Sequence, residues 1–137
     1  LVTKVLYTKK GRSKTFIIVD GAMNDLIRPT LYEGHHDVIP VQRGNEIQTR
    51  LCDIVGPICE SGDYLAQNRI LPKLNENDLL AIKSAGAYGA AMSSTYNSRP
   101  LVPEVLVNGS EFCLIRRRQT VQESIDLEQI PNWLETD

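Results

Sequence analysis

The chain has 137 residues, which suits a single domain, and 42% of them are hydrophobic and 23% charged. This composition predicts a folded core and excludes an intrinsically disordered chain. The formal net charge is −2, so neither nucleic acid nor a membrane surface is expected as the main partner. No apolar run approaches the roughly 18 residues of a membrane-spanning helix. The three cysteines are an odd number without CxxC spacing, which disfavours a disulfide framework or a zinc site and favours a reducing, cytoplasmic location.

The amino-terminal segment predicts an antiparallel hairpin. Residues 2–9 alternate in the manner of a strand, residues 10–13 carry a turn signal, and residues 16–19 form an apolar run. Because the chain starts at Leu1, inside this strand pattern and without a Met, we expect it to be a piece of a longer polypeptide.

The middle of the chain mixes strands with irregular segments. Further strands are expected over residues 38–42, 47–55 and 78–83. Residues 22–36 have no clean period and predict a loop or short helical turns, and residues 56–63 predict a loop. The small-residue segment 86–98 predicts no clear element.

A strong hairpin signal follows in the last third. Residues 104–107 and 111–117 are expected to be strands on either side of Asn108-Gly109. An Asn-Gly pair supplies the positive φ angles of a type I′ turn, so we expect a second antiparallel hairpin with that turn.

A short helix completes the pattern. Thr120 and Glu123 match a capping box, which predicts a helix over residues 121–129 that ends before Pro131. With about seven short strands and this helix, the sequence predicts a mainly β domain: an antiparallel β-barrel or sandwich with a short C-terminal helix.

Three irregular segments carry polar residues that folding of a β domain does not require, which makes them candidates for a functional site. In the first, Arg28 offers a fork of donors that suits a carboxylate, and Tyr32 shares its face if the segment is helical. In the second, the Cys59 thiol adjoins the Glu60 carboxylate, which suits a proton donor and provides a partner for an ammonium group. In the third, small residues around Tyr88 leave room for a ligand to reach its hydroxyl.

Each segment also has a purely structural interpretation. Arg28 is then an ordinary surface arginine beside a tyrosine packed at the domain edge. Cys59 is a half-buried cysteine in a turn, and the segment around Tyr88 packs tightly against the sheet. Residue spacing alone leaves both interpretations open.

Other features give weaker indications. His35-His36 lacks a third ligand, so exposed loop histidines and no metal site are expected. The run from Arg116 to Arg118 lies at a strand end and predicts an alternating solvated face in preference to a phosphate patch. Cys52 and Cys113 fall inside strand patterns and are expected to be packing residues.

The three segments together resemble the C-terminal β domain of the diaminopimelate decarboxylases. These belong to the pyridoxal-phosphate-dependent decarboxylases that have an alanine-racemase-like barrel. The residues that carry the resemblance lie at 20–29, 56–63, 85–89 and 93–100. The run from Cys59 to Asp63 is the most specific part, and ornithine decarboxylases look similar there but have Asp in place of Glu60.

The resemblance implies a role for each candidate residue. Arg28 would bind a substrate carboxylate with Tyr32 beside it, and Tyr88 would contact both the cofactor phosphate and the substrate. Cys59 would be the proton donor and Glu60 would hold the distal ammonium group, both reaching into the partner subunit's active site in a homodimer. The implied reaction is the decarboxylation of meso-2,6-diaminopimelate to L-lysine in lysine biosynthesis, with pyridoxal 5'-phosphate as cofactor.

The resemblance also implies what this chain lacks. In the family, the cofactor-binding lysine and the glycine-rich phosphate loop lie in an N-terminal barrel, which is absent from this chain. We therefore expect residues 1–137 to be the C-terminal β domain alone, inactive as a decarboxylase by itself. Three alternatives stay open: a related decarboxylase acting on ornithine, arginine or carboxynorspermidine, a non-catalytic homologue that dimerises with an active enzyme, and a stand-alone β binding module.

Overall fold

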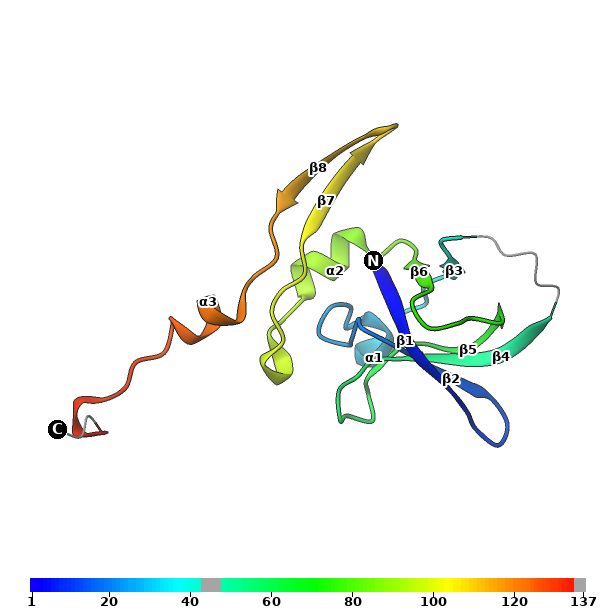
Figure 1. Ribbon diagram of the computed structural model, residues 1–137, viewed down its shortest axis with the longest axis horizontal. Helices are drawn as coiled ribbons and strands as arrows, with labels where there is room; N and C mark the ends of the chain where they lie inside the picture. The colour runs from blue at the N-terminus through cyan, green and yellow to red at the C-terminus, as the bar shows by residue number, and fades with distance from the viewer. Residues whose placement is uncertain (43–47, 135–137) are drawn as a thin grey trace. The chain divides into compact units, whose positions relative to one another are not determined.

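The structure is a computed structural model that describes residues 1–42 and 48–134 (Figure 1). The chain divides into two compact units, Leu1–Ser93 and Ser94–Asp137, although its length favoured a single domain. No helix among the described residues is long and apolar enough to span a membrane.

The first unit is a six-stranded sheet. Its strands are β1 (Val2–Lys10), β2 (Thr15–Val19), β3 (Val38–Pro40), β4 (Thr49–Val55), β5 (Tyr64–Pro72) and β6 (Leu79–Ile82). Their order across the sheet is β3-β6-β1-β2-β4-β5, and Figure 1 shows the β1–β2 hairpin beside the long β4–β5 pair. The predicted strand at 47–55 begins at Thr49, and the expected first residue, Ile47, lies outside the described residues.

The sheet is mixed, which corrects the expectation of a purely antiparallel one. The β1–β2 hairpin is antiparallel as predicted, but β2 and β4 pair in parallel. Between them the chain leaves β2, passes through α1 (Arg28–Tyr32), adds β3 at the far edge and returns to run beside β2 in the same direction. A parallel pair needs such a long crossover connection, and the irregular period of residues 22–36 does not reveal its direction.

The sheet curls until its two edges meet, so the unit is a nearly closed barrel. The edge strands β3 and β5 lie in contact. Arg69 on β5 donates from Nη2 to the His36 carbonyl oxygen at 3.2 Å and lies 3.0 Å from His35 Nδ1. These contacts fasten β5 to the segment that enters β3, which favours the barrel over the sandwich.

The barrel interior follows the predicted alternation. Thr3 and Val5 of β1 point inward, and a bulge between Val5 and Tyr7 then ends the buried stretch. Cys52 is buried in the core, as predicted, and burial raises the pKa of its thiol. Cys113, in contrast, is exposed, so the prediction that it is a packing residue was wrong.

Strand β5 had no counterpart in the sequence prediction. Its pattern breaks at Asn68, which has a φ of 54° and sits where β4 and β5 shift register. The Asp53 carboxylate stabilises this irregular point by accepting the Asn68 N–H at 2.8 Å and pairing with Lys14 Nζ at 2.5 Å. Asp53 and Lys14 lie 15 and 54 residues from Asn68 in the sequence. Local periodicity therefore could not identify this strand.

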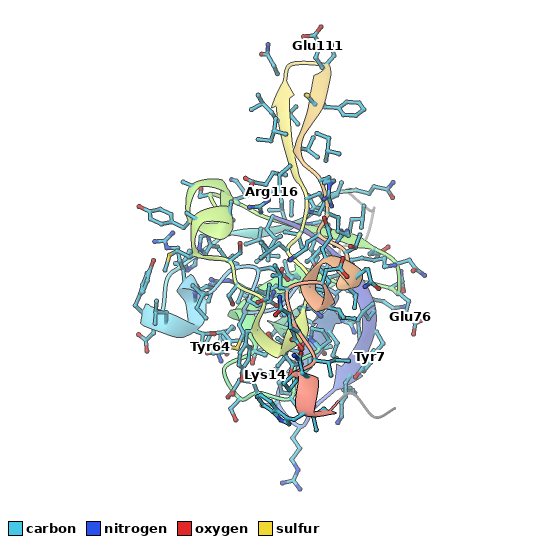
Figure 2. The ribbon with its side chains drawn as sticks, turned by 90° about the vertical axis from the view of Figure 1, so that its left-hand side faces the viewer. Tyr7, Lys14, Tyr64, Glu76, Glu111 and Arg116 are labelled. Atoms are coloured by element: carbon cyan, nitrogen blue, oxygen red, sulfur yellow. The ribbon has the colours of Figure 1, made fainter. Side chains whose placement is uncertain are left out.

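The second unit contains the predicted hairpin of β7 (Glu104–Asn108) and β8 (Glu111–Arg116). Figure 2 shows Glu111 at the hairpin tip and Arg116 at its base. The two-residue loop is Gly109-Ser110, and only Gly109 has a positive φ. A positive φ at the first loop residue alone fits a type II′ turn, so the predicted type I′ turn was wrong.

Helix α3 (Val121–Ile125) begins with the predicted capping box but ends four residues earlier than expected. The Glu123 side chain accepts from Arg117 and from the Thr120 backbone, and these bonds lower the pKa of its carboxyl to about 2. Arg117 and Arg118 are exposed, which agrees with the predicted solvated face, and Arg116 forms an ion pair with Glu104 at 3.0 Å that was not predicted. No described residue of this unit is buried, although many are apolar.

Candidate functional site

Arg28 and Tyr32 lie on α1, a one-turn helix. The turn before it is closed by the Asp25 carboxylate, which accepts the Ala22 N–H at 2.9 Å. Pro29 follows Arg28 at the start of the helix, where a missing N–H costs nothing. Arg28 and Tyr32 are four positions apart and therefore share a face, as expected if the segment is helical.

The Arg28 guanidinium lies close to two tyrosine rings. Its Nε donates to Tyr32 Oη at 2.7 Å, and its Cζ lies 5.5 Å from the Tyr32 ring centroid. The same Cζ lies 4.4 Å from the ring centroid of Tyr88, which belongs to α2 (Gly86–Met92). A guanidinium this close to an aromatic face is stabilised by roughly 0.5–2 kcal/mol. The structure thus brings together three of the five predicted site residues.

This arrangement leaves part of the guanidinium available. An arginine has five N–H donors, of which one is used by Tyr32 and one faces His36 Nε2 at 3.5 Å. Within the part of the chain that the structure describes, the other three have no protein acceptor. Tyr32 and Tyr88 are 49% and 50% exposed, so a ligand can reach the cluster from solvent. A cation with unused, pre-oriented donors suits a carboxylate or a phosphate.

Cys59 and Glu60 project from the loop between β4 and β5. The buried Asp63 carboxylate holds this loop by accepting the Ile58 N–H at 2.6 Å and the Met23 N–H at 2.8 Å. A Cβ at Gly56 would lie 2.3 Å from Asp63 Oδ2, so only glycine allows the carboxylate this position. The frame of the loop is therefore rigid, while Cys59 and Glu60 are exposed.

The loop touches α1 on the side away from Arg28. Thr30 Oγ1 donates to the Gly62 carbonyl oxygen, and Tyr64 Oη donates to the Pro29 carbonyl oxygen at 3.2 Å. Thr30 and Arg28 are two positions apart, so their side chains leave the helix on opposite sides. Among the described residues, no hydrogen bond or ion pair joins Cys59 to Arg28, Tyr32 or Tyr88. The structure therefore does not bring Cys59 into the Arg28 cluster.

His36 was missed as a neighbour of this cluster. It was predicted to be an exposed loop histidine, which holds for His35, but His36 is 1% exposed. Its Nδ1 lies 2.9 Å from the carbonyl oxygen of Lys83, the residue that follows β6. This hydrogen bond holds the His36 ring in the barrel wall, where β6 is paired with β3. The only local signal was a period of two, since Val38, two residues on, is also buried.

Comparison with known proteins identifies relatives of this chain. Residues 1–86 match the family model described as the pyridoxal-dependent decarboxylase, C-terminal sheet domain. The chain is 50% identical over 134 residues to the diaminopimelate decarboxylase of Zymomonas mobilis and 55% identical over 123 residues to that of Pseudomonas aeruginosa. These alignments cover 98% and 90% of this chain.

A solved structure agrees with these sequence matches. The diaminopimelate decarboxylase of M. jannaschii, in co-complex with L-lysine, superposes with a TM-score of 0.91 at 35% identity, covering 98% of this chain. The shared part is 30% of that protein, 31% of the Z. mobilis relative and 29% of the P. aeruginosa one. The chain therefore spans about a third of the length of the relatives that it matches.

Proposed function

The chain belongs to the family of C-terminal sheet domains of pyridoxal-dependent decarboxylases, and from this premise we propose that residues 1–137 are the C-terminal β domain of a diaminopimelate decarboxylase. The complete protein would release carbon dioxide from the D-centre of meso-2,6-diaminopimelate and yield L-lysine. The relatives of about 50% identity carry that name, and the M. jannaschii structure was solved with L-lysine.

The Arg28 cluster is the observation that carries the proposal. The substrate has two carboxylates and two ammonium groups, so a site specific for it needs a fixed cation for the carboxylate that does not react. Arg28 supplies that cation, and Tyr32 and Tyr88 set the plane of its guanidinium. Fixing the far end of the substrate in this way positions the bond that breaks.

Cys59 and Glu60 supply the complementary groups. Glu60 binds the distal ammonium group, which the opposite charge of its carboxylate favours. Loss of carbon dioxide leaves an electron pair on the reacting carbon, and the Cys59 thiol gives its proton to that carbon. The resulting thiolate regains a proton from solvent, which its exposed position permits.

The placement of the loop supports a homodimer with shared active sites. Cys59 and Glu60 belong to a loop on the side of α1 opposite Arg28, and no hydrogen bond or ion pair connects Cys59 to the Arg28 cluster within residues 1–42 and 48–134. We propose that Cys59 and Glu60 of one copy complete the active site of the second copy, whose own Arg28 cluster binds the substrate.

The residues present fit only the edge of the pyridoxal phosphate. The Tyr88 hydroxyl is accessible and suits a phosphate oxygen. Lys83, which follows β6, has its Nζ 3.9 Å from Asp37 and shows no contact with Arg28 among the described residues. When bound, the cofactor supplies an electron sink for the carbon that loses carbon dioxide. The lysine that binds the cofactor covalently would belong to the part of the protein outside this chain.

A substrate assay on the complete protein that contains this chain tests the proposal. Meso-diaminopimelate, L-ornithine and L-arginine are compared, and we expect decarboxylation of meso-diaminopimelate with L-lysine as product. Arg28→Gln should raise KM for diaminopimelate about tenfold or more, since a hydrogen-bonded charge pair is lost. Arg12→Gln, at an exposed arginine of the β1–β2 turn, is the matched control and should leave KM unchanged. Preference for ornithine or arginine in the wild-type protein would refute the proposed substrate.

A further inference from the structure

We propose that His36 is a positioning residue for Arg28: a buried neutral imidazole that accepts from the guanidinium and thereby aims its remaining donors at the substrate carboxylate. The inference rests on the proposed function, because it assigns a role within the same site. The resemblance to the decarboxylases gave His36 no role.

The hydrogen bond at Nδ1 sets the state of the ring. Its partner is the Lys83 carbonyl oxygen at 2.9 Å, and a carbonyl oxygen can only accept, so Nδ1 carries the hydrogen. In a neutral imidazole the other nitrogen, Nε2, is then an acceptor. That nitrogen faces Arg28 Nη1 at 3.5 Å. A doubly protonated ring would instead direct an N–H at the guanidinium, and the two cations would repel each other.

The backbone brings His36 back to Arg28 by a tight reversal. Glu33 ends α1 with a φ of 59°, and the Gly34 N–H donates to the Arg28 carbonyl oxygen at 3.0 Å. A Cβ at Gly34 would lie 3.0 Å from Arg28 Cβ and 3.1 Å from the Arg28 carbonyl oxygen, so the chain passes directly over this residue. The histidine two residues later consequently lies beside the guanidinium of the helix that the chain has just left.

The barrel then fixes His36 itself. Its carbonyl oxygen accepts from Arg69 of β5 at 3.2 Å, and the next residue, Asp37, accepts the Lys83 N–H at 2.8 Å. His36 is 1% exposed, whereas Tyr32 and Tyr88 are about half exposed. Of the three side chains that contact the guanidinium in the described structure, His36 is thus the one with a rigid surrounding. Through its bonds to Lys83 and Arg69, His36 fixes the orientation of the Arg28 guanidinium relative to the barrel.

Two amide variants separate this role from a purely structural one. His36→Asn keeps a donor at the position of Nδ1, toward Lys83, but cannot reach Arg28. His36→Gln places its amide oxygen near the position of Nε2 and can still accept from Arg28. His35→Asn is the matched control, because this neighbouring histidine is exposed and makes no contact with Arg28.

Steady-state kinetics on the complete protein gives the readout, together with the melting temperature of each variant. We expect His36→Asn to raise KM by about two- to tenfold, the worth of one hydrogen bond, with a smaller change in kcat. His36→Gln should restore most of that loss, and His35→Asn should match the wild type. If His36→Asn does not fold, His36→Phe, which keeps an aromatic ring and loses both nitrogens, takes its place in the comparison.

Two results would overturn the inference. One is an unchanged KM in a folded His36→Asn or His36→Phe enzyme, and the other is an equal rise in KM for the Asn and Gln variants. A purely structural role predicts these results, with both variants losing melting temperature alike. If the wild type acts on another amino acid, the proposed substrate is wrong, but the same KM comparison on that amino acid still decides the role of His36.

Discussion

Asp63→Asn should loosen the two segments that carry the proposed site. The buried Asp63 carboxylate accepts the Met23 N–H at 2.8 Å and the Ile58 N–H at 2.6 Å. Asparagine has the same shape, but its amide nitrogen must face one of these two donors. A hydrogen bond to a charged group contributes about 1.5–3 kcal/mol, so weakening one bond and losing the other should cost about 2–4 kcal/mol of local stability.

Amide hydrogen exchange on the complete protein measures this loss directly. At about 1.4 kcal/mol per factor of ten, exchange at Met23 and Ile58 should speed up by about 30- to 700-fold. Asp78→Asn is the matched control, because its carboxylate accepts a single backbone N–H, that of Asn75 at 2.7 Å, in a different turn. Unchanged exchange at both Met23 and Ile58 in a folded Asp63→Asn protein, with faster exchange at Asn75 in the control, would refute this account of the loop.

Three further predictions follow from the same contacts. Gly56→Ala should lower the melting temperature by several degrees because its Cβ would meet the Asp63 carboxylate, whereas Gly86→Ala, with open space around it, should be neutral; equal melting temperatures would contradict this. Cys59→Ala should lower kcat for lysine formation by about 10²- to 10⁴-fold with little change in KM, and a kcat close to wild type would remove its role as proton donor. Because the folded-state pKa of Glu123 is lowered to about 2, its contribution to capping α3 should be complete above about pH 4.5 and lost as the pH falls toward 2; an NMR titration of this carboxyl with a midpoint near 4.5 would contradict it.

Much of the fold could be predicted because alternation and turn chemistry are local. The β1–β2 hairpin, the β7–β8 hairpin and the capping box of α3 each depend on residues within about a dozen positions of one another. The parallel pairing of β2 with β4 and the strand β5 depend on distant partners, which periodicity does not contain. The prediction of the turn type was wrong because the two-residue loop lies one residue later than the Asn-Gly pair indicated, so Gly109 is its first residue.

The candidate site, like the fold, could be predicted only in part. Spacing of four on a short helix correctly placed Arg28 and Tyr32 on one face, but only the family resemblance connected them to Tyr88, 60 residues from Arg28 in a segment without a clear pattern. The burial of His36 was not predicted because it depends on contacts with Lys83 and Arg69, which lie far away in the sequence. The residues of the site lie on short helices and loops, where contacts between individual side chains decide the geometry.

The segment from Gly56 to Asp63 shows how a specific motif combines two kinds of constraint. The Asp63 carboxylate fills the space that a side chain at Gly56 would need, and Asp63 also holds the Met23 segment that precedes α1. The Cys59 side chain, in contrast, is exposed and makes no hydrogen bond to the Gly56–Asp63 pair in the part of the chain that the structure describes. The glycine and the aspartate are therefore explained by folding. The proposed proton transfer from Cys59 is the reason that Cys59→Ala should affect kcat, whereas Gly56→Ala should affect stability.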